Sequence, residues 1–489
     1  MGKDLTLSHE ASQSASFYEG GRFTLANRDF INAASPFEDV AFSERDTLRA
    51  RARWLHENNP IISNIDRTIV ANVIGGGLKF QFKLGSETTD DSVERLNSEI
   101  ELAWEVAKDE LDITGSVHFD ELCKIALKNR FMDGECLFYL PIVDVGFGGK
   151  ELKIQPIEVD RFALGYVEMT NGGFYDGIEI DKFGKNVAYH ISDGAFEKIK
   201  IAGKNNKKIS SSVKIPARDA IYYFKKDNRF SQIRGVSEYK QTIIDLKNFA
   251  AFMRSTIEGA RSRANIAYVL KRQNPEMLRN LSEKPIEVIN GIFVQNLRPT
   301  DTLEVLDPKI ADDNFGVFVE AVLRLIASGR GVSYELASRD FSRVNYSGGR
   351  MSLLQDYKLF DDDLLHFSRN FYRPIFMRWL EFEALKGSFK YLSYQKFLEL
   401  KNQIKASAIL LYPPRREWVD PLKESKAIAT ELEYNTTTLS EIYARRGLDW
   451  REGLKQIAIE KDFAESLGLS RFNNAKLIVN TNDKEDDNE

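Results

Sequence analysis

Four basic residues recur every seven positions along one stretch of the chain: Lys240, Lys247, Arg254 and Arg261. On an α-helix this spacing places the side chains in one stripe with a small angular drift. A row of cations can bind phosphate groups, or it can stay solvated and keep a helix soluble. The sequence leaves both interpretations of this basic stripe open.

A second basic group follows Gly331 and continues past the pair Gly348-Gly349. It consists of Arg339, Arg343, Asn345, Tyr346 and Arg350. These side chains could face a polyanion, or the arginines could pair with carboxylates at contacts between subunits. We keep both alternatives.

Catalytic arrangements are not apparent. Residues 145–150 are rich in glycine, but Glu151 stands where a phosphate-binding loop needs Ser or Thr, so a hairpin turn is predicted. The five histidines are scattered singly, without paired zinc-ligand spacing. Three consecutive aspartates, residues 361–363, would point in different directions on a helix and are expected on a solvated face. We therefore predict no enzyme, no metal site and no cofactor.

Composition limits the partners and the compartment. The net charge is −5, which argues against a general electrostatic grip on nucleic acid and favours local or weak contact. Cys123 and Cys136 are the only cysteines, and we expect them to be buried and reduced. With no signal peptide and no apolar run of membrane-spanning length, we expect a cytosolic protein without a membrane partner.

An apolar stripe runs beside the basic one. Its members alternate spacings of four and three residues, as on one face of a helix. They are Tyr239, Ile243, Leu246, Ala250, Met253, Ile257 and Ala260. This apolar seam predicts a long packed helix.

The other elements place this helix within an α+β fold. Short antiparallel strands are expected at 135–142, 152–157, 177–180 and 186–191, with an exposed lysine-rich loop at 198–212. A β-rich insert at 263–309 separates the long helix from a second amphipathic helix that ends near Gly329. Later helices are expected at 351–385, kinked at Pro374, and over 392–467 with a break at Pro413-Pro414.

One region resembles a known family. Residues 215–222, Arg229 and residues 232–237 are similar to the signature region of lambda-type portal proteins of tailed bacteriophages. Further similar segments follow the family's order: 51–59, 73–77, 133–135, 157–161, 177–179, 331–334, 345–347 and 418–424. Gly348-Gly349 departs from the bulkier pair expected there.

The resemblance implies a portal fold with an α/β wing, a helical stem, a small β-rich clip and a mainly helical C-terminal region. The implied division is an N-terminal arm at 1–42, wing at 43–235, stem helix at 236–264, clip at 265–311, second stem helix at 312–329, tunnel loop at 330–350, long kinked wing helix at 351–391, helical crown region at 392–472 and disordered acidic tail at 473–489. The apolar seam would then be buried only between copies, the basic stripe would face neighbouring copies or DNA, and the tunnel loop would narrow the DNA channel.

The same resemblance implies function and partners. The protein would form a homo-oligomeric ring, a dodecamer, at one vertex of the virion capsid, after assembly in the host cytoplasm. Double-stranded DNA would pass through its channel without sequence readout. The terminase large subunit, the major capsid or scaffolding protein, and a head-completion or tail adaptor protein would bind it. Alternatives from other classes are a different capsid or tail connector and a metal-dependent nuclease.

Overall fold

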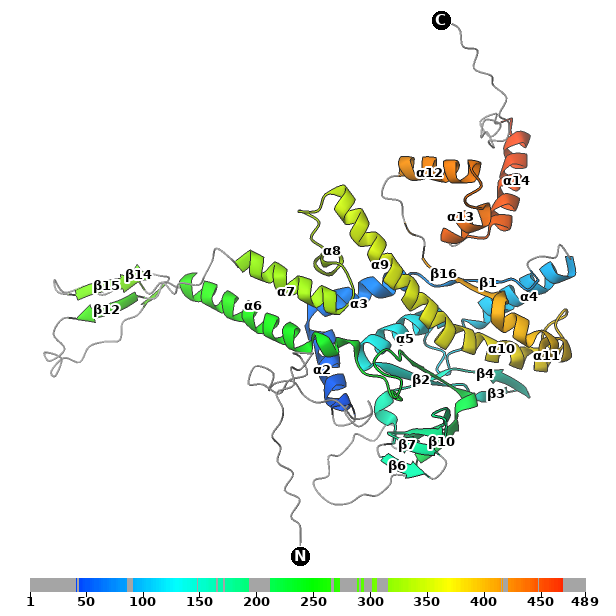
Figure 1. The fold of residues 1–489 in the computed structure, drawn as a ribbon, viewed down its shortest axis with the longest axis horizontal. Coiled ribbons are helices and arrows are strands. Elements are labelled where there is room, and N and C mark those ends of the chain that lie inside the picture. The colour runs from blue at the N-terminus through cyan, green and yellow to red at the C-terminus, as the bar shows by residue number, and fades with distance from the viewer. Residues whose placement is uncertain are drawn as a thin grey trace, which may run out of the picture.

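A computed structural model describes residues 41, 44–85, 91–146, 148–163, 166–169, 172–192, 212–264, 268–272, 288–289, 292–293, 301–305, 315–414, 416, 421–446 and 448–468. The fold is α+β, as predicted: helices form the centre of an elongated molecule and antiparallel strands form separate small sheets (Figure 1). The predicted arm at 1–42 apart from Ala41, the loop at 198–211 and the tail at 473–489 lie outside the described residues.

Helices from both halves of the chain form the main core. The N-terminal helices are α2 (Arg45–Asn58), α3 (Pro60–Val73), α4 (Asp91–Ala107) and α5 (Phe119–Asp133). The break between α2 and α3 is local: the Asn59 side chain accepts the backbone N–H of Ile61 at 3.0 Å, and Pro60 occupies the first helical position. In the core the indole N–H of Trp104 donates to the Tyr372 hydroxyl at 2.8 Å.

A long helical rod crosses this core. It consists of α9 (Tyr346–Phe367), one π-helical turn (Ser368–Tyr372) and α10 (Arg373–Lys386). Pro374 lies in the first turn of α10, so the irregularity expected at this proline occurs as the π-helical turn before it. A further helix, α11 (Tyr394–Gln403), packs against α10.

Two sheets and a hairpin form the strand-rich part. The first sheet has the order β11 (Ala220–Phe224), β2 (Glu135–Tyr139), β5 (Gln155–Ile157). The second is an antiparallel meander whose strands follow sequence order: β6 (Tyr166–Met169), β7 (Gly172–Tyr175), β8 (Ile178–Asp181), β9 (Asn186–Ser192) and β10 (Ser212–Pro216). The glycine-rich stretch joins the hairpin β3 (Ile142–Gly146) and β4 (Gly149–Leu152), as predicted.

Two helices project from the body side by side towards a strand-rich tip (Figure 1). A short 3₁₀ turn (Glu238–Gln241) precedes α6 (Ile243–Ala264), and α7 (Phe315–Gly329) returns. The insert between them contains β12 (Tyr268–Arg272) paired with β15 (Asp301–Val305), and β13 (Val288–Ile289) paired with β14 (Ile292–Phe293). The single strand expected at 286–294 is therefore two short strands that pair antiparallel.

The C-terminal part contains one strand that the helical prediction for 392–467 missed. β16 (Ile409–Tyr412) pairs with β1 (Lys79–Phe82), far away in the sequence. Its apolar run ends at Pro413-Pro414. After it come α12 (Pro421–Glu433), α13 (Leu439–Arg445) and α14 (Trp450–Ser466).

Candidate functional site

The predicted basic stripe lies along the projecting helix. Lys240 is at its base, where Nζ donates to Asn228 Oδ1 at 2.6 Å. Lys247, Arg254 and Arg261 are exposed, and their side chains have no hydrogen-bond or ion-pair partner within the described part of the chain. Three of the four cations are therefore not neutralised by any residue that the structure describes.

The apolar seam divides into a buried base and an open tip. Tyr239, Ile243 and Leu246 belong to the chain's own core, so they need no second copy; the expectation that the whole seam is buried only between copies is wrong for these three. Ala250 and Met253 are half-buried, while Ile257 and Ala260 are exposed. The reason is that the base of the helix is enclosed by α2 and α5, which the sequence pattern could not reveal.

The contact between the two projecting helices uses residues outside the predicted seam. The Phe252 ring on α6 lies 4.8 Å from the Phe318 ring and 5.8 Å from the Phe315 ring on α7, measured between centroids. Val317 and Leu325 on α7 remain exposed. The paired helices thus leave apolar side chains on their surface even after packing on each other.

The predicted tunnel segment is a short helix, α8 (Tyr334–Ser338), followed by a link into α9. Arg339 adopts a left-handed conformation with φ of 61° at the C-terminal cap of α8. Its guanidinium donates to Asn64 Oδ1 at 3.1 Å and to Thr68 Oγ1 at 2.9 Å, both on α3. Arg343 is largely exposed and pairs with Glu320 of α7 at 3.0 Å. The segment is thus attached to the body and to the projecting helices.

The remaining residues of this group lie at the start of α9. The Asn345 side chain caps the helix by accepting the backbone N–H of Gly348 at 2.7 Å. Arg350 approaches Glu424 of α12 at 3.6 Å, and the half-exposed Tyr346 ring lies 5.6 Å from the Lys423 ammonium. Arg343 and Arg350 therefore pair with carboxylates of their own chain, and the alternative of pairing at contacts between subunits stays a prediction.

Replacing Asn345 by Ala is expected to lower the free energy of unfolding by about 1 kcal/mol, because the first turn of α9 loses its cap. Asn345→Asp should retain the cap and the stability. Chemical denaturation of the two variants measures the difference. Equal stability of both variants would contradict the capping role.

A buried ion pair, which the sequence analysis did not single out, fixes the segment before α6. The Arg234 guanidinium forms a two-pronged contact with the Glu135 carboxylate, including Nε to Oε2 at 2.9 Å, and both side chains are almost completely buried. The same carboxylate accepts the backbone N–H of Gly235 at 2.8 Å and the Tyr222 hydroxyl. Although burial alone raises the pKa of Glu135, the charge and hydrogen bonds of Arg234 lower it to about 2, with Arg49 and Arg45 adding to the effect.

Two glycines allow this ion pair to form. A Cβ atom on Gly235 would lie 2.2 Å from the Gly134 carbonyl oxygen, and a Cβ on Gly134 would lie 2.3 Å from the Val236 carbonyl carbon. Gly134 also has φ of +87°, which disfavours other residues. Two backbone segments thus cross in direct contact, Asp133-Gly134-Glu135 and Arg234-Gly235. We call this crossing, with the Arg234–Glu135 pair, the glycine joint.

A second buried cluster holds the bases of both projecting helices. Asp66 of α3 accepts the Tyr239 hydroxyl, the Arg330 guanidinium at 3.1 Å and a contact from His56 Nδ1 at 3.1 Å. Arg330 also reaches Glu238 at 3.3 Å. Because Tyr239 precedes α6 and Arg330 follows α7, one carboxylate binds both helices. We call this the Asp66 cluster.

The three consecutive aspartates at 361–363 form ion pairs within the chain. The three consecutive aspartates bind different cations: Asp361 pairs with Arg416, Asp362 with Lys225, and Asp363 with Arg130. Asp363 is mostly buried, so the expectation of a solvated face is wrong for it, since α5 covers that side.

Both cysteines are free and buried, as expected. Within the described ranges, no group of three His, Cys, Asp or Glu side chains is placed to hold a metal ion, and no helix has the length and apolar character needed to cross a bilayer.

Exposed apolar and basic faces on a helix pair, anchored by buried ion pairs in an α+β body, are features of a structural assembly protein. The family described as phage portal protein, lambda family, matches residues 26–362. The chain therefore belongs to the lambda family of phage portal proteins, and it functions as a phage portal, the connector at the virion capsid.

Individual relatives agree with the family. The chain is similar to the probable portal protein of Halomonas phage phiHAP-1, with 23% identity over 93% of this chain and 89% of the relative. It is 27% identical to the portal protein of Escherichia phage N15 over 40% of this chain and 37% of the relative. It is 26% identical to portal protein B of Escherichia phage lambda, over 37% of this chain and 34% of that protein.

Solved structures show a distant likeness. The neck of an empty gene transfer agent (GTA) particle matches 83% of this chain and 94% of its own chain at 12% identity, with a TM-score of 0.46. An HK97 family phage portal protein from Corynebacterium diphtheriae matches 64% of this chain and 83% of its own at 9% identity, with a TM-score of 0.30.

Proposed function

We propose that twelve copies of this chain form a closed ring whose channel conducts double-stranded DNA during packaging and ejection. In this proposal α6 and α7 form the stem, the insert at 265–311 forms the clip, and the segment at 330–350 narrows the channel. The terminase large subunit binds the clip and hydrolyses ATP, whereas this chain has no nucleotide turnover. Head-completion or tail adaptor proteins bind the same end later, and the capsid or scaffolding protein contacts the wing.

The single observation that supports this proposal most is the charge pattern of α6. Lys247, Arg254 and Arg261 are exposed and unpaired in the described part of a chain that is acidic overall. Repetition around a ring would create basic bands that phosphates sense within about 10 Å at moderate salt. Isolated basic bands in a protein that is acidic overall would hold DNA weakly enough to let it slide.

The apolar surface supports ring formation independently. Ile257 on α6 and Val317 and Leu325 on α7 are exposed in the single chain, at 49%, 63% and 58%. Apolar side chains gathered on one projecting element favour contact with a second copy, because their exposure to water is unfavourable. In this proposal neighbouring stems cover them.

Reversing two charges tests the channel role. Arg254→Glu with Arg261→Glu should leave ring formation intact and lower the yield of packaged genomes by roughly tenfold or more, because the inward band becomes acidic. Quantitative PCR of nuclease-protected DNA after infection measures the yield, and negative-stain electron microscopy counts the rings.

The matched control, Lys358→Glu with Lys455→Glu, reverses two exposed lysines elsewhere that pair with no described residue. This control should package normally. Normal packaging by the Arg254 and Arg261 variant would rule out the channel role of the stripe, and loss of rings in that variant would assign the two arginines to subunit contacts instead.

A further inference from the structure

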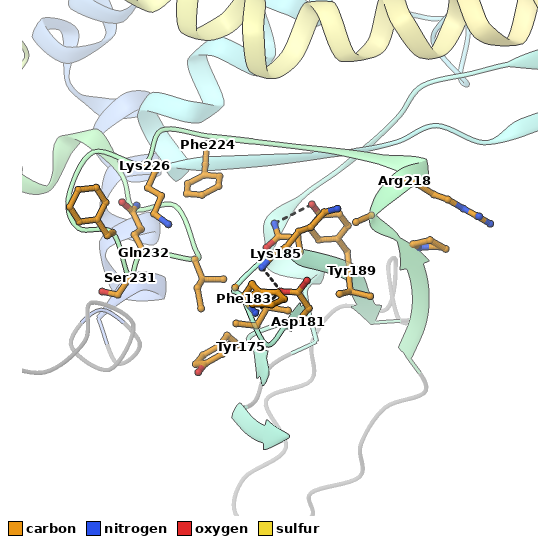
Figure 2. A pocket seen from close by; sticks show the side chains of 18 residues that line it. Tyr175, Asp181, Phe183, Lys185, Tyr189, Arg218, Phe224, Lys226, Ser231 and Gln232 are labelled. Atoms are coloured by element: carbon orange, nitrogen blue, oxygen red, sulfur yellow. Dashed lines mark hydrogen bonds between the residues drawn. The ribbon is translucent and has the colours of Figure 1, made fainter. Parts of the chain in front are cut away.

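A groove of about 1200 Å³ lies between the β8–β9 hairpin and the loop that precedes Arg234 (Figure 2). None of the contacts described above uses it. Six side chains define its character: Phe183, Lys185, Tyr189, Arg218, Lys226 and Phe230. Aromatic rings and cations therefore share one concave surface.

Two aromatic rings at the edges of this groove are exposed to solvent, and hydrogen-bonded turns fix their positions. Phe183 is 83% exposed, and its turn is fixed because the Asp181 carboxylate accepts the backbone N–H groups of Phe183 at 2.8 Å and Lys185 at 2.9 Å. Phe230 is fully exposed, and the buried Gln232 pins its loop by donating to the Arg234 carbonyl at 3.0 Å. Exposed rings on pinned turns are typical of binding surfaces, since the described part of the chain covers little of either ring.

The charge of the groove selects an acidic partner. Lys185, Arg218 and Lys226 are exposed, whereas Asp181 is the acidic residue of the lining and is engaged by its own turn. Arg218 only approaches its sequence neighbour Asp219, at 3.5 Å. The lining thus carries an excess of positive charge, which attracts acidic segments and disfavours basic ones.

The start of α2 contacts a residue that adjoins the groove lining in the sequence. Arg45, at the beginning of α2, donates through Nη1 to Asp176 Oδ2 at 3.2 Å, and both side chains are buried. Asp176 directly follows Tyr175, which lines the groove. The chain that precedes residue 44 therefore joins the body next to this surface.

The composition of residues 1–43 is complementary to the groove. This segment has six acidic and three basic residues, a net charge of −3. It also contains six aromatic residues that could fill a groove edged by rings: Phe17, Tyr18, Phe23, Phe30, Phe37 and Phe42. By contrast, the connection between β9 and β10 is rich in lysine, and it leaves the sheet at the Ser192–Ser212 pair, the opposite end from Pro216 in the groove.

We propose that the N-terminal segment, residues 1–43 of the same chain, binds in this groove and packs aromatic side chains against Phe183 and Phe230. This interaction surface goes beyond the proposed channel, because it lies on the wing and does not depend on ring formation. Its occupant follows from where the chain enters the body, from the opposite charges and from the shared aromatic character.

Limited trypsin digestion of the full chain tests this proposal. When the N-terminal segment is bound in the groove, the sites after Arg22 and Arg28 are protected from trypsin. Phe183→Ser with Phe230→Ser should accelerate cleavage at these sites on the order of tenfold, because two aromatic anchors are lost. Both rings are exposed, so the variant should fold normally. The control Phe341→Ser, which removes an exposed ring elsewhere, should cleave like the original chain. Equal cleavage rates in all three proteins would overturn the proposal.

A photo-crosslinking residue at position 230 identifies the occupant directly. Crosslinks to peptides from residues 1–43 support the proposal, whereas crosslinks to another part of the chain, to another protein or to DNA overturn it. The segment could also bind the groove of a neighbouring copy, and mixing ¹⁴N- and ¹⁵N-labelled chains before irradiation distinguishes the two cases. Crosslinked peptides that carry a single isotope support binding within one chain. Crosslinked peptides that carry both isotopes overturn the proposal in favour of binding between copies.

Discussion

Arg234→Met should lower the free energy of unfolding by about 3–5 kcal/mol, because it leaves the Glu135 carboxylate buried without its cation. Methionine fills much of the same volume, so the loss reports the charge rather than a cavity. The lost guanidinium also frees the Asp176 carbonyl oxygen, which it binds in the folded chain. Equilibrium unfolding in urea, followed by tryptophan fluorescence, measures the change.

Two further variants test whether the unpaired buried charge causes the loss of stability. Arg218→Met removes an arginine that is 83% exposed and should change the stability by less than about 0.5 kcal/mol. Arg234→Met combined with Glu135→Gln should recover part of the loss, since no buried charge remains unpaired. If the double variant is as unstable as the sum of the two single ones, the ion pair is not the reason for the loss.

The same pair predicts a dependence on pH. The pKa of Glu135 falls from an ordinary 4.5 to about 2 in the folded chain. A lowered carboxyl pKa stabilises the folded state above pH 4.5, and this contribution disappears as the pH falls from 4.5 towards 2. In the Arg234→Met variant the stability should therefore depend less steeply on pH in this interval.

The sequence was sufficient for elements with a strong local period. The four- and three-residue spacing of the apolar seam, from Tyr239 to Ala260, predicted the projecting helix. Turn residues around short β-branched runs predicted strands β2, β5, β8 and β9, but gave no ranges for β6, β7 and β10, which complete the meander. These signals lie within a few residues of each other. The insert between the two helices followed from its prolines and β-branched residues in the same way.

Contacts between residues far apart in the sequence could not be predicted from local patterns. Strand β16 was missed because its partner β1 lies more than 300 residues earlier, and a four-residue apolar run does not by itself distinguish strand from helix. Glu135 and Arg234 are separated by 99 positions, and Asp66 and Arg330 by 264. A lone Asp or Arg in a sequence gives no sign of being buried, so the two anchoring clusters became visible only in three dimensions.

These clusters explain how slender helices can keep a fixed direction. A projecting pair such as α6 and α7 has few contacts along its length, and its orientation depends on its attachment. The glycine joint fixes the chain just before α6, whereas the Asp66 cluster joins the start of α6 to the end of α7. Buried ion pairs suit this purpose because their geometry is specific, even where apolar residues would stabilise as much.

Asp66→Ala is expected to weaken both helices at their bases. The variant leaves Glu238, at 3.3 Å, as the one carboxylate among the described residues that pairs with the buried Arg330 guanidinium, and it removes the acceptor for the Tyr239 hydroxyl. We expect a loss of about 3 kcal/mol or more in the free energy of unfolding. Amide hydrogen exchange should increase at the start of α6 and the end of α7 together, since one carboxylate holds both, and should stay unchanged in strands β8 and β9.

The control is Asp361→Ala, which removes a half-exposed carboxylate from its pair with Arg416 and should cost less than about 1 kcal/mol. Asp66→Asn keeps an acceptor oxygen without the charge, so it should lie between Asp66→Ala and the original chain. Faster exchange in α6 alone, with α7 unaffected, would mean that Arg330 is held by Glu238 rather than by Asp66. Since α6 and α7 form the proposed stem, ring preparations of Asp66→Ala should also show stems in variable directions when imaged by electron microscopy.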